Sequence, residues 1–262
     1  MNKSVGETGE APGSSDELRS PVGAARPAAL VTGSAKGAGR AMLLALAADG
    51  FDVAVHYLSS EQEAHRTAMM ARELGVNATV LPADVTVEAQ ARGLVDAAVR
   101  EFGRLDVLVN NVGNYHNGPL EELSGDVWRE MLASNLNATF YTCQRALPEL
   151  RRSPRGGRIV NLGYAGAEIV KARPKIVAYG IAKTGVILYT KALAQVEAAN
   201  GVTANVISPG VLENSVSQPL GQVPMRRSGR LDELAAALRY FVSEEAAYVT
   251  GVTLELAGGW NL

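Results

Sequence analysis

The chain has 262 residues, of which 47% are hydrophobic and 20% are charged, so it can bury a substantial core, and its length suits one α/β domain. Its formal net charge is -2, and its scattered Lys and Arg residues form no basic stripe, which excludes nucleic acid as an expected partner. With one cysteine, no signal-peptide core and no apolar run of transmembrane length, we expect a cytoplasmic protein with no internal disulfide and no membrane partner.

The first predicted segment is residues 1–26, in which turn-forming and charged residues outnumber large apolar ones. Such a composition cannot repay the entropy of ordering, so we expect a flexible N-terminal tail. A single folded domain is expected to occupy residues 27–262.

From residue 27 onward, short apolar and β-branched runs alternate with stretches of helical periodicity. Seven runs have the composition of strands: residues 29–32, 53–57, 78–81, 107–110, 158–162, 203–207 and 252–256. The helical stretches between them span residues 40–49, 61–74, 87–102, 126–151, 179–200 and 231–242. Strands joined by crossover helices pair in parallel and are covered on both faces. The pattern therefore predicts an α/β fold, a doubly wound seven-stranded parallel sheet with helices on both faces.

Small residues follow the first predicted strand, where the chain must turn sharply into a helix. Gly33, Gly37 and Gly39 permit a tight turn and a close backbone approach, and the amides at the start of a helix attract phosphate. A flexible strand-to-helix turn would use such residues too. Their position after the first strand of an alternating chain favours nucleotide binding.

The end of the second strand, at Tyr57, lacks the acidic residue that would hold the ribose hydroxyls of NAD. Lys36 and the hydroxyls of Ser59 and Ser60 could instead accept a ribose 2′-phosphate, so we expect NADP(H) as the cofactor. In the alternative interpretation, Lys36 is merely solvated and the serines cap the helix that begins at Glu61. Both interpretations can hold for the serines.

Tyr179 and Lys183 are four residues apart in a helical stretch and therefore share one face of the helix. An ammonium group beside the phenol would favour its ionised form and lower its pKa from about 10, which would make the phenol usable as an acid or base near neutrality. An isolated pair of this kind is more often a packed phenol beside a snorkelling lysine. The surrounding motifs decide between the two interpretations.

Five short motifs occur in order along the chain: residues 32–39, Asn110-Asn111-Val112-Gly113, Asn135, Tyr179 with Lys183, and Pro209-Gly210. In type and order they resemble the short-chain dehydrogenase/reductase family over nearly all of residues 27–262. The resemblance implies a Rossmann fold and hydride transfer between a nicotinamide and a carbonyl or alcohol carbon. It also implies that Tyr179 transfers the proton, and that Lys183 activates Tyr179 and binds the nicotinamide ribose. By the same resemblance, Asn135 holds a water that links Lys183 to solvent.

By the same resemblance, Asp84 and Val85 would hold the adenine, and residues 251–259 look like the closing strand and Gly-Gly turn of the family. The expected cofactor-binding residues are Gly33, Ser34, Lys36, Gly37, Ala38, Gly39, Tyr57, Ser59, Ser60, Asp84, Val85, Asn111, Gly113, Tyr179, Lys183, Pro209, Gly210 and Leu212. No metal is expected, because the three histidines are scattered without a pair at ligand spacing, which is typical of surface or packing residues.

One departure from the family pattern follows the fifth strand, where the family reads Asn-x-Ser-Ser and this chain reads Asn161-Leu162-Gly163-Tyr164. In the family the second serine bonds the substrate carbonyl. Tyr164 could supply the missing hydroxyl, because a tyrosine reaches further than a serine, and we count it among the candidate catalytic residues. Alternatively, it lines the pocket as an aromatic wall and takes no part in the chemistry.

These features predict an NADPH-dependent reductase of a ketone or similar small-molecule carbonyl, in which Tyr179 is the proton donor, Lys183 its activator and Asn135 the relay. A pteridine reductase or a reductase of 3-oxoacyl thioesters would fit the same residues. The missing serine also leaves open a non-catalytic sensor or scaffold that binds NADP, although retention of the catalytic residues argues against it. Family members commonly assemble through the helices that correspond to residues 135–151 and 179–200, so we expect a homo-oligomer, with a tetramer favoured.

Further candidates for the substrate cleft follow two of the strands. Tyr115 and His116 come just after the Gly113 turn, and ligands bind beyond the carboxyl ends of parallel strands. Residues 211–230 are rich in Gly, Pro and Ser, a composition that suits a mobile lid over a substrate.

Overall fold

The computed structural model describes residues 26–261, so the tail predicted over residues 1–26 lies outside them except for Arg26, as does Leu262. The described residues contain the seven predicted strands, with bounds shifted by no more than a residue or two. The strands are β1 (Ala28–Val31), β2 (Asp52–Tyr57), β3 (Ala78–Pro82), β4 (Val107–Asn110), β5 (Arg158–Leu162), β6 (Thr203–Pro209) and β7 (Thr253–Leu256).

All seven strands are parallel and form one sheet in the order β3-β2-β1-β4-β5-β6-β7. From β1, the strands β2 and β3 are added on one side of the sheet. The chain then crosses to the other side of β1, where β4 to β7 are added in order. In open parallel sheets, ligands bind beyond the carboxyl ends of the strands where this reversal occurs. The topology therefore directs attention to the loops that follow β1 and β4.

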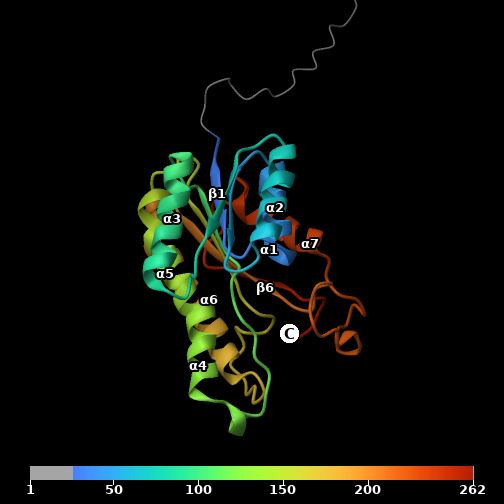
Figure 1. The fold of residues 1–262 in the computed structure, drawn as a ribbon. Helices are drawn as coiled ribbons and strands as arrows, with labels where there is room; N and C mark the ends of the chain where they lie inside the picture. The colour runs from blue at the N-terminus through green and yellow to red at the C-terminus, as the bar shows by residue number, and fades with distance from the viewer. Residues whose placement is uncertain (1–25, 262) are drawn as a thin grey trace, which may run out of the picture.

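Helices cover both faces of the sheet, as the sequence predicts (Figure 1). One layer contains α1 (Gly37–Ala48), α2 (Glu61–Glu73) and α7 (Leu231–Val242). The other contains α3 (Glu88–Phe102), α5 (Ala138–Leu150) and α6 (Val177–Glu197). The prediction of a doubly wound sheet in a single domain is confirmed.

Two apolar cores, one on each face of the sheet, hold these layers together. Consecutive strand residues point to opposite faces, so Val31 of β1 packs with the α1, α2 and α7 layer, while its neighbour Leu30 packs with the α3, α5 and α6 layer. Both side chains are fully buried. This double burial explains why the strands are uninterrupted apolar runs and do not alternate with polar residues.

The helix predicted over residues 126–151 is interrupted, and this prediction was wrong in detail. A short helix, α4 (Gly125–Met131), is followed by a π-helical segment, Leu132–Asn137, and only then by α5. A π turn widens the helix and changes the direction in which its side chains point, and such segments are frequent at functional sites. Ser134 and Asn135 lie in this segment and are buried.

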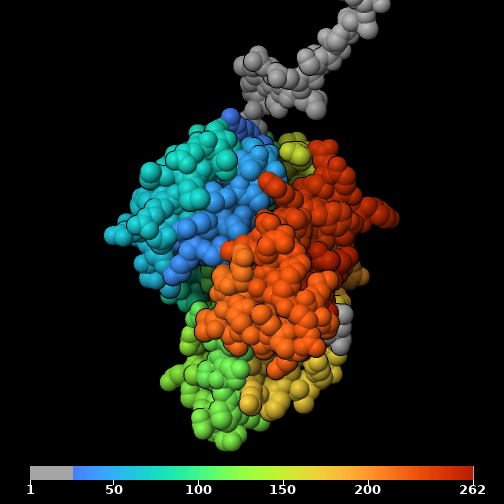
Figure 2. Space-filling view, turned by 90° about the vertical axis from the view of Figure 1, so that its right-hand side faces the viewer, coloured from blue at the N-terminus to red at the C-terminus, as the bar shows by residue number. Residues whose placement is uncertain are grey.

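The loops after the carboxyl ends of the strands gather at one end of the sheet, on the side where α4 lies (Figure 1). The segment between β6 and α7 contributes a 3-10 turn, Leu220–Gln222, and covers the middle of the face in Figure 2, where it is orange beside the blue residues of α1. There the Asn214 side chain reaches the start of α1 at Gly37. Among the helices of residues 26–261, none has the length and apolar character needed to cross a membrane.

Candidate active site

The glycine-rich loop between β1 and α1 has a backbone that only glycine accommodates easily. Gly33 and Gly37 have φ angles of +65° and +58°, in the left-handed region. A Cβ atom on Gly39 would lie 2.3 Å from the carbonyl oxygen of Gly33, so the first turn of α1 packs directly against the loop. These are the properties of a loop that admits a phosphate to the start of a helix.

Asn111, which follows β4, fixes the loop from the side of the sheet. Its Nδ2 donates to the carbonyl oxygens of Thr32 and Gly33, at 3.0 and 3.2 Å, and its backbone amide donates to the Thr32 hydroxyl at 3.0 Å. The amide side chain thus holds the loop, a role that the sequence pattern did not specify. Asn111 also lines the groove described below.

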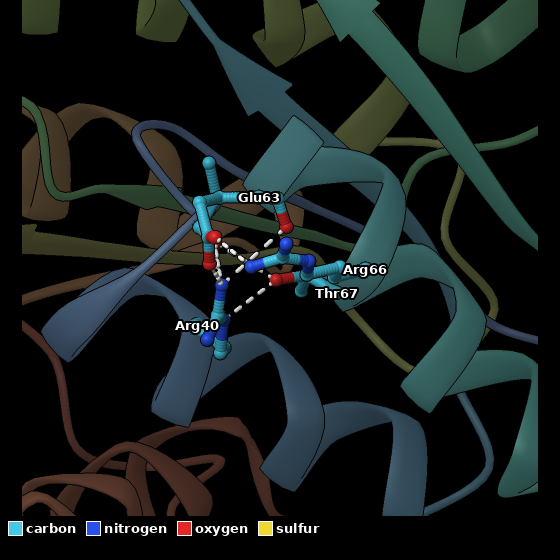
Figure 3. Close-up of polar contacts among 5 residues, drawn as sticks. Arg40, Glu63, Arg66 and Thr67 are labelled. Atoms are coloured by element: carbon cyan, nitrogen blue, oxygen red, sulfur yellow. Dashed lines mark hydrogen bonds and ion pairs between the residues drawn. The ribbon is translucent and has the colours of Figure 1, made fainter. Parts of the chain in front are cut away.

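A second set of contacts fixes the loop to α2 (Figure 3). The carbonyl oxygen of Ala35 accepts hydrogen bonds from the Arg40 guanidinium and from the Thr67 hydroxyl. Arg40 also pairs with Glu63 at 2.5 Å, and this hydrogen bond holds the pKa of the Glu63 carboxyl below its usual value. Arg40 is therefore committed to the structure of the loop.

Beside the loop lies a groove of about 390 Å³. Nine of the expected cofactor-binding residues line it: Gly33, Lys36, Tyr57, Ser59, Ser60, Asp84, Val85, Asn111 and Gly113. Its wall also includes residues that the sequence analysis did not assign to a cofactor, namely Ala35, His56, Leu58, Ala83, Thr86, Val112, Asn114 and Ser134. Most of them are direct neighbours in the sequence of residues that were predicted to bind the cofactor. Their position next to those residues is the feature of the sequence that could have identified them.

The remaining expected cofactor-binding residues lie elsewhere. Ser34 is fully buried beneath the loop, and Gly37, Ala38 and Gly39 begin α1. Pro209 is the last residue of β6, and Gly210 and Leu212 follow it; the Gly210 amide donates to the Leu256 carbonyl oxygen of β7 at 2.9 Å. None of these seven residues lines the 390 Å³ groove.

The hydroxyls of the two serines after β2 make no hydrogen bond to another side chain or backbone group within residues 26–261. Ser60 occupies the N-cap position of α2, but its side chain makes no capping hydrogen bond. The interpretation of Ser60 as a cap is therefore wrong in this structure. Both Ser59 and Ser60 line the groove, together with Lys36, and no carboxylate other than Asp84 does so.

Asn135 and Lys183 meet at Gly113, which also lines the groove, and Tyr179 lies beside Lys183. A Cβ atom on Gly113 would lie 2.3 Å from Asn135 Oδ1 and 3.2 Å from Lys183 Nζ, so only glycine leaves room for both groups. Lys183 Nζ donates to the Leu162 carbonyl oxygen at 2.8 Å and lies 5.8 Å from the centroid of the Tyr179 ring. The structure thus brings the three predicted residues together at the edge of the groove.

Asn135 owes its position to the π-helical segment. Its Nδ2 donates to the carbonyl oxygens of Asn114 and Met131, each at 3.0 Å. Its Oδ1 is buried and has no hydrogen-bond partner within residues 26–261. A buried acceptor without a partner next to Lys183 is the arrangement that a proton relay through a polar ligand or water requires.

The pKa shifts at this centre correct one prediction. Burial raises the pKa of the Tyr179 phenol, and the neighbouring phenols of Tyr164 and Tyr115 raise it further. We expected Lys183 to lower this pKa, but burial raises it, and Lys183 Nζ bonds the Leu162 carbonyl oxygen and not the phenol. Burial also lowers the pKa of Lys183 from its usual value to about 8. At neutral pH the phenol is therefore protonated and Lys183 is mostly charged.

Tyr164 packs against Tyr179, with ring centroids 5.5 Å apart in an edge-to-face arrangement. Its hydroxyl accepts a hydrogen bond from Asn261 at 3.3 Å, and the Arg173 guanidinium lies 5.4 Å from its ring centroid. The Tyr115 ring also packs edge-to-face on Tyr179, with ring centroids 5.0 Å apart. The Tyr179 ring thus contacts two other tyrosine rings.

Gly163, which replaces the first serine of the family pattern, has a local reason to be glycine. A Cβ atom there would lie 2.4 Å from Ser208 Oγ, on the neighbouring strand β6. The Ser208 hydroxyl is buried and has no partner within the described residues. The Ser208 side chain therefore occupies the space that a side chain at residue 163 would need.

The three histidines are not near one another. His65 is exposed on α2, His116 is half-buried after β4, and His56 is buried at the end of β2. Within residues 26–261, no three His, Cys, Asp or Glu side chains are grouped so that they could hold a metal ion. The absence of a metal stays a prediction.

Comparison with known proteins places this geometry in a family. Residues 33–261 match the family described as Enoyl-(Acyl carrier protein) reductase. The 3-oxoacyl-[acyl-carrier-protein] reductase FabG of Staphylococcus aureus is 32% identical over 240 residues, which cover 88% of this chain and 96% of that protein. The chain belongs to the short-chain dehydrogenase/reductase family. As a member of this family it is an oxidoreductase.

Other short-chain dehydrogenase/reductase proteins are similarly close. Glucose 1-dehydrogenase 2 of Bacillus subtilis is 34% identical over 245 residues, covering 89% of this chain and 94% of that protein. The crystal structure of a blue fluorescent protein from a metagenomic library, in complex with NADPH, superposes with a TM-score of 0.84. That protein is 31% identical, and the match covers 90% of this chain and 98% of that one.

Proposed function

We propose that this short-chain dehydrogenase/reductase is an NADPH-dependent reductase of a ketone or similar small-molecule carbonyl, with Tyr179 as the proton donor. The observation that carries the proposal is the position of Gly113. This residue lines the groove beside the glycine-rich loop and also adjoins Asn135 Oδ1 and Lys183 Nζ. A dinucleotide in the groove would therefore end next to the residues that transfer the proton.

The protein contributes the proton, its resupply and the positioning of the carbonyl. When bound, the nicotinamide supplies the hydride. Tyr179 donates its phenolic proton to the carbonyl oxygen, and burial, which raises the pKa of the phenol, keeps it protonated at neutral pH before the reaction. Lys183 stabilises the phenolate that remains, and Asn135 Oδ1 accepts a hydrogen bond in the relay that returns a proton.

Tyr164 would act as the second hydrogen-bond donor to the carbonyl, in place of the family's serine. Its ring touches that of Tyr179, and its hydroxyl accepts from Asn261, which leaves its own proton free to be donated. Removing one preorganised donor of this kind costs on the order of a hundredfold in kcat. We therefore expect Tyr164→Phe to lower kcat about a hundredfold without changing the Kd for NADPH, as measured by steady-state kinetics and cofactor titration. An unchanged kcat would make Tyr164 an aromatic wall only.

NADP(H) is proposed over NAD(H) on the charge of the groove. Lys36 and two free serine hydroxyls face the region after β2, and no acidic residue ends that strand. The structural relative that was crystallised with NADPH supports the same assignment. Titration of the protein with NADPH and NADH, followed by nicotinamide fluorescence, would test it. Tighter binding of NADH would overturn it.

A Tyr179→Phe variant tests the proton donor. We expect it to bind NADPH normally and to lose turnover by a factor of about 10² to 10⁴, the usual contribution of general acid catalysis. Tyr189→Phe is the matched control, because Tyr189 is another partly buried tyrosine of α6 but packs against Phe140, away from the groove. Full turnover in Tyr179→Phe would refute the assignment.

The substrate class should be tested with a panel of ketones, 3-oxoacyl thioesters and pterins. The thioesters deserve a place because a relative named as a 3-oxoacyl-[acyl-carrier-protein] reductase is 32% identical. Pterins test the pteridine reductase alternative. Tight NADPH binding with no oxidation of NADPH by any member of the panel would favour a cofactor-binding sensor or scaffold.

We also propose that the protein works as a cytoplasmic homotetramer. Ile181 and Leu188 of α6 are 48% and 64% exposed, and they border an apolar groove that includes Leu136. Apolar side chains grouped in this way on a helix are typical of a subunit interface. The single buried cysteine suits a reducing compartment.

A further inference from the structure

His56, at the end of β2, contacts both sides of the proposed dinucleotide groove although it is only 1% exposed. Its Nδ1 accepts a hydrogen bond from the Gly33 amide at 2.8 Å, and its Nε2 lies 3.0 Å from the carbonyl oxygen of Ala83. Gly33 belongs to the glycine-rich loop, and Ala83 lies in the loop after β3, directly before Asp84; all three line the groove. One imidazole therefore connects the loop after β1 with the loop after β3.

The backbone of His56 reinforces the same connection. Its amide donates to the Ser34 hydroxyl at 3.0 Å, and its carbonyl oxygen accepts from the Ser34 amide at 3.0 Å. Ser34 is itself fully buried. Two consecutive residues of the glycine-rich loop are thus hydrogen-bonded to this one residue.

The two ring partners allow only one state of the imidazole. The Gly33 amide can only donate and the Ala83 carbonyl can only accept, so the ring must be neutral, with its proton on Nε2. A second proton would have to be placed on Nδ1, pointing at the Gly33 N–H. Burial lowers the pKa of His56 and so favours the neutral ring at physiological pH.

We propose that His56 is a positioning residue for the cofactor, which holds the glycine-rich loop and the loop after β3 at the spacing that the dinucleotide needs and releases them when Nδ1 is protonated. This inference rests on the proposed dinucleotide binding. Gly33 has a φ of +65°, and its N–H has no other acceptor among the hydrogen bonds of the described residues, so the orientation of this peptide depends on His56. Backbone amides of such loops are the groups that bind pyrophosphate.

The charged groups around the ring set how readily it is protonated. Asp84, from the loop after β3, attracts the proton and opposes the effect of burial. Lys36, from the glycine-rich loop, lines the same groove and would oppose a second positive charge. Protonation of Nδ1 removes an acceptor and adds a buried charge, so we expect weaker cofactor binding as the pH falls through the pKa of His56, which burial holds below its usual value.

Two isosteric variants separate the two hydrogen bonds. In His56→Asn, the side-chain oxygen can take the place of Nδ1 and still accept from Gly33, whereas in His56→Gln, the amide nitrogen can take the place of Nε2 and still donate to Ala83. We expect His56→Gln to raise the Kd for NADPH at least tenfold at pH 7.5, and His56→Asn to recover most of that loss. His65→Gln, on the exposed face of α2, is the control and should bind like the native chain.

A pH titration provides a second readout, which does not depend on how well the Gln variant folds. The Kd for NADPH should be measured from pH 5 to 8 for the native chain and for His56→Asn. Because the 2′-phosphate titrates near pH 6 in both, the ratio of the two Kd values is the informative quantity. We expect the native chain to lose affinity relative to His56→Asn as the pH falls.

Equal NADPH affinity in the Asn and Gln variants, or a Kd ratio that does not change with pH, would overturn the role of His56. Failure of the native chain to bind NADPH or NADH at any pH would instead overturn the proposed function. A thermal melt of each variant, recorded without cofactor, identifies any Kd change that reflects loss of folded protein. The two failures are therefore distinguishable.

Discussion

At the scale of single residues, the pKa values of Lys183 and Tyr179 are shifted in opposite directions by the same cause. Lys183 is buried and Tyr179 is half-buried on α6, and their removal from water favours the uncharged form of each. The phenol therefore keeps its proton, while the ammonium loses its proton more easily than usual. In the proposed mechanism, the lowered pKa of Lys183 suits it to passing a proton back to the phenol after each turnover.

The buried ammonium predicts how stability depends on pH. The pKa of Lys183 is about 8 in the folded protein, against about 10.5 in the unfolded chain. Between these values the unfolded chain binds more protons, so the contribution of Lys183 makes the free energy of unfolding rise with pH, by at most about 3 kcal/mol. Denaturant unfolding at pH 8 and pH 10 should show this rise in the native chain and not in Lys183→Met. The same slope in both proteins would contradict the assignment.

At the scale of secondary-structure elements, a buried polar network joins the strands to the helices behind the active site. Asn110 of β4 donates to Asn161 of β5 at 2.9 Å, and Asn161 donates to the Thr190 hydroxyl of α6 at 2.8 Å. Thr142 of α5 donates to Asn110 Oδ1 at 2.7 Å. Every one of these side chains is buried, so the network fixes how α6, which carries Tyr179 and Lys183, lies on the sheet.

Cys143 lies next to this network and is a buried free cysteine. It is fully buried, and its Sγ is 3.2 Å from Asn110 Nδ2. Burial raises the pKa of its thiol to about 12. The thiol therefore stays protonated at physiological pH and acts as a small packing residue.

Thr190→Val tests the network. The valine keeps the shape of the side chain but leaves the Asn161 amide without an acceptor, which costs about 1–3 kcal/mol for a buried polar group. Thr139→Val is the matched control, since the Thr139 hydroxyl bonds only the Asn135 carbonyl within its own helix. We expect urea unfolding to show a clearly larger loss for Thr190→Val. Equal losses would mean that the contact with Asn161 contributes nothing specific.

At the scale of the whole molecule, the apolar surface of α6 predicts association between chains. Leu188→Glu would place a charge at the centre of the proposed interface, and burying an unpaired charge in a subunit contact is strongly unfavourable. We expect this variant to elute as a smaller species than the native chain, with light scattering giving the mass of each. Met69→Glu, at an exposed position of α2 in the opposite helix layer, should leave the mass unchanged. A native chain that is already monomeric would contradict the proposed tetramer.

The sequence by itself predicts the seven strands, the helix layers and the residues that meet near Gly113. Strand and helix periodicities are local, and a glycine turn or a Tyr and Lys pair four residues apart is visible without knowing the fold. The resemblance to a family then assigns these residues to one site. The order of the motifs made that assignment specific, because each motif alone has a structural explanation.

Properties that depend on burial or on partners distant in the sequence are decided only by the tertiary structure. The sequence analysis treats His56 as a surface or packing residue, and nothing in its neighbours along the chain indicates that its ring bonds Gly33 and Ala83. The π-helical segment that turns Asn135 toward Lys183 is likewise invisible in a continuous helical pattern. The prediction that the pKa of Tyr179 is lowered was wrong, because the direction of the shift depends on how much water the fold removes from the phenol. Desolvation is a property of the packed protein and cannot be obtained from residue spacing.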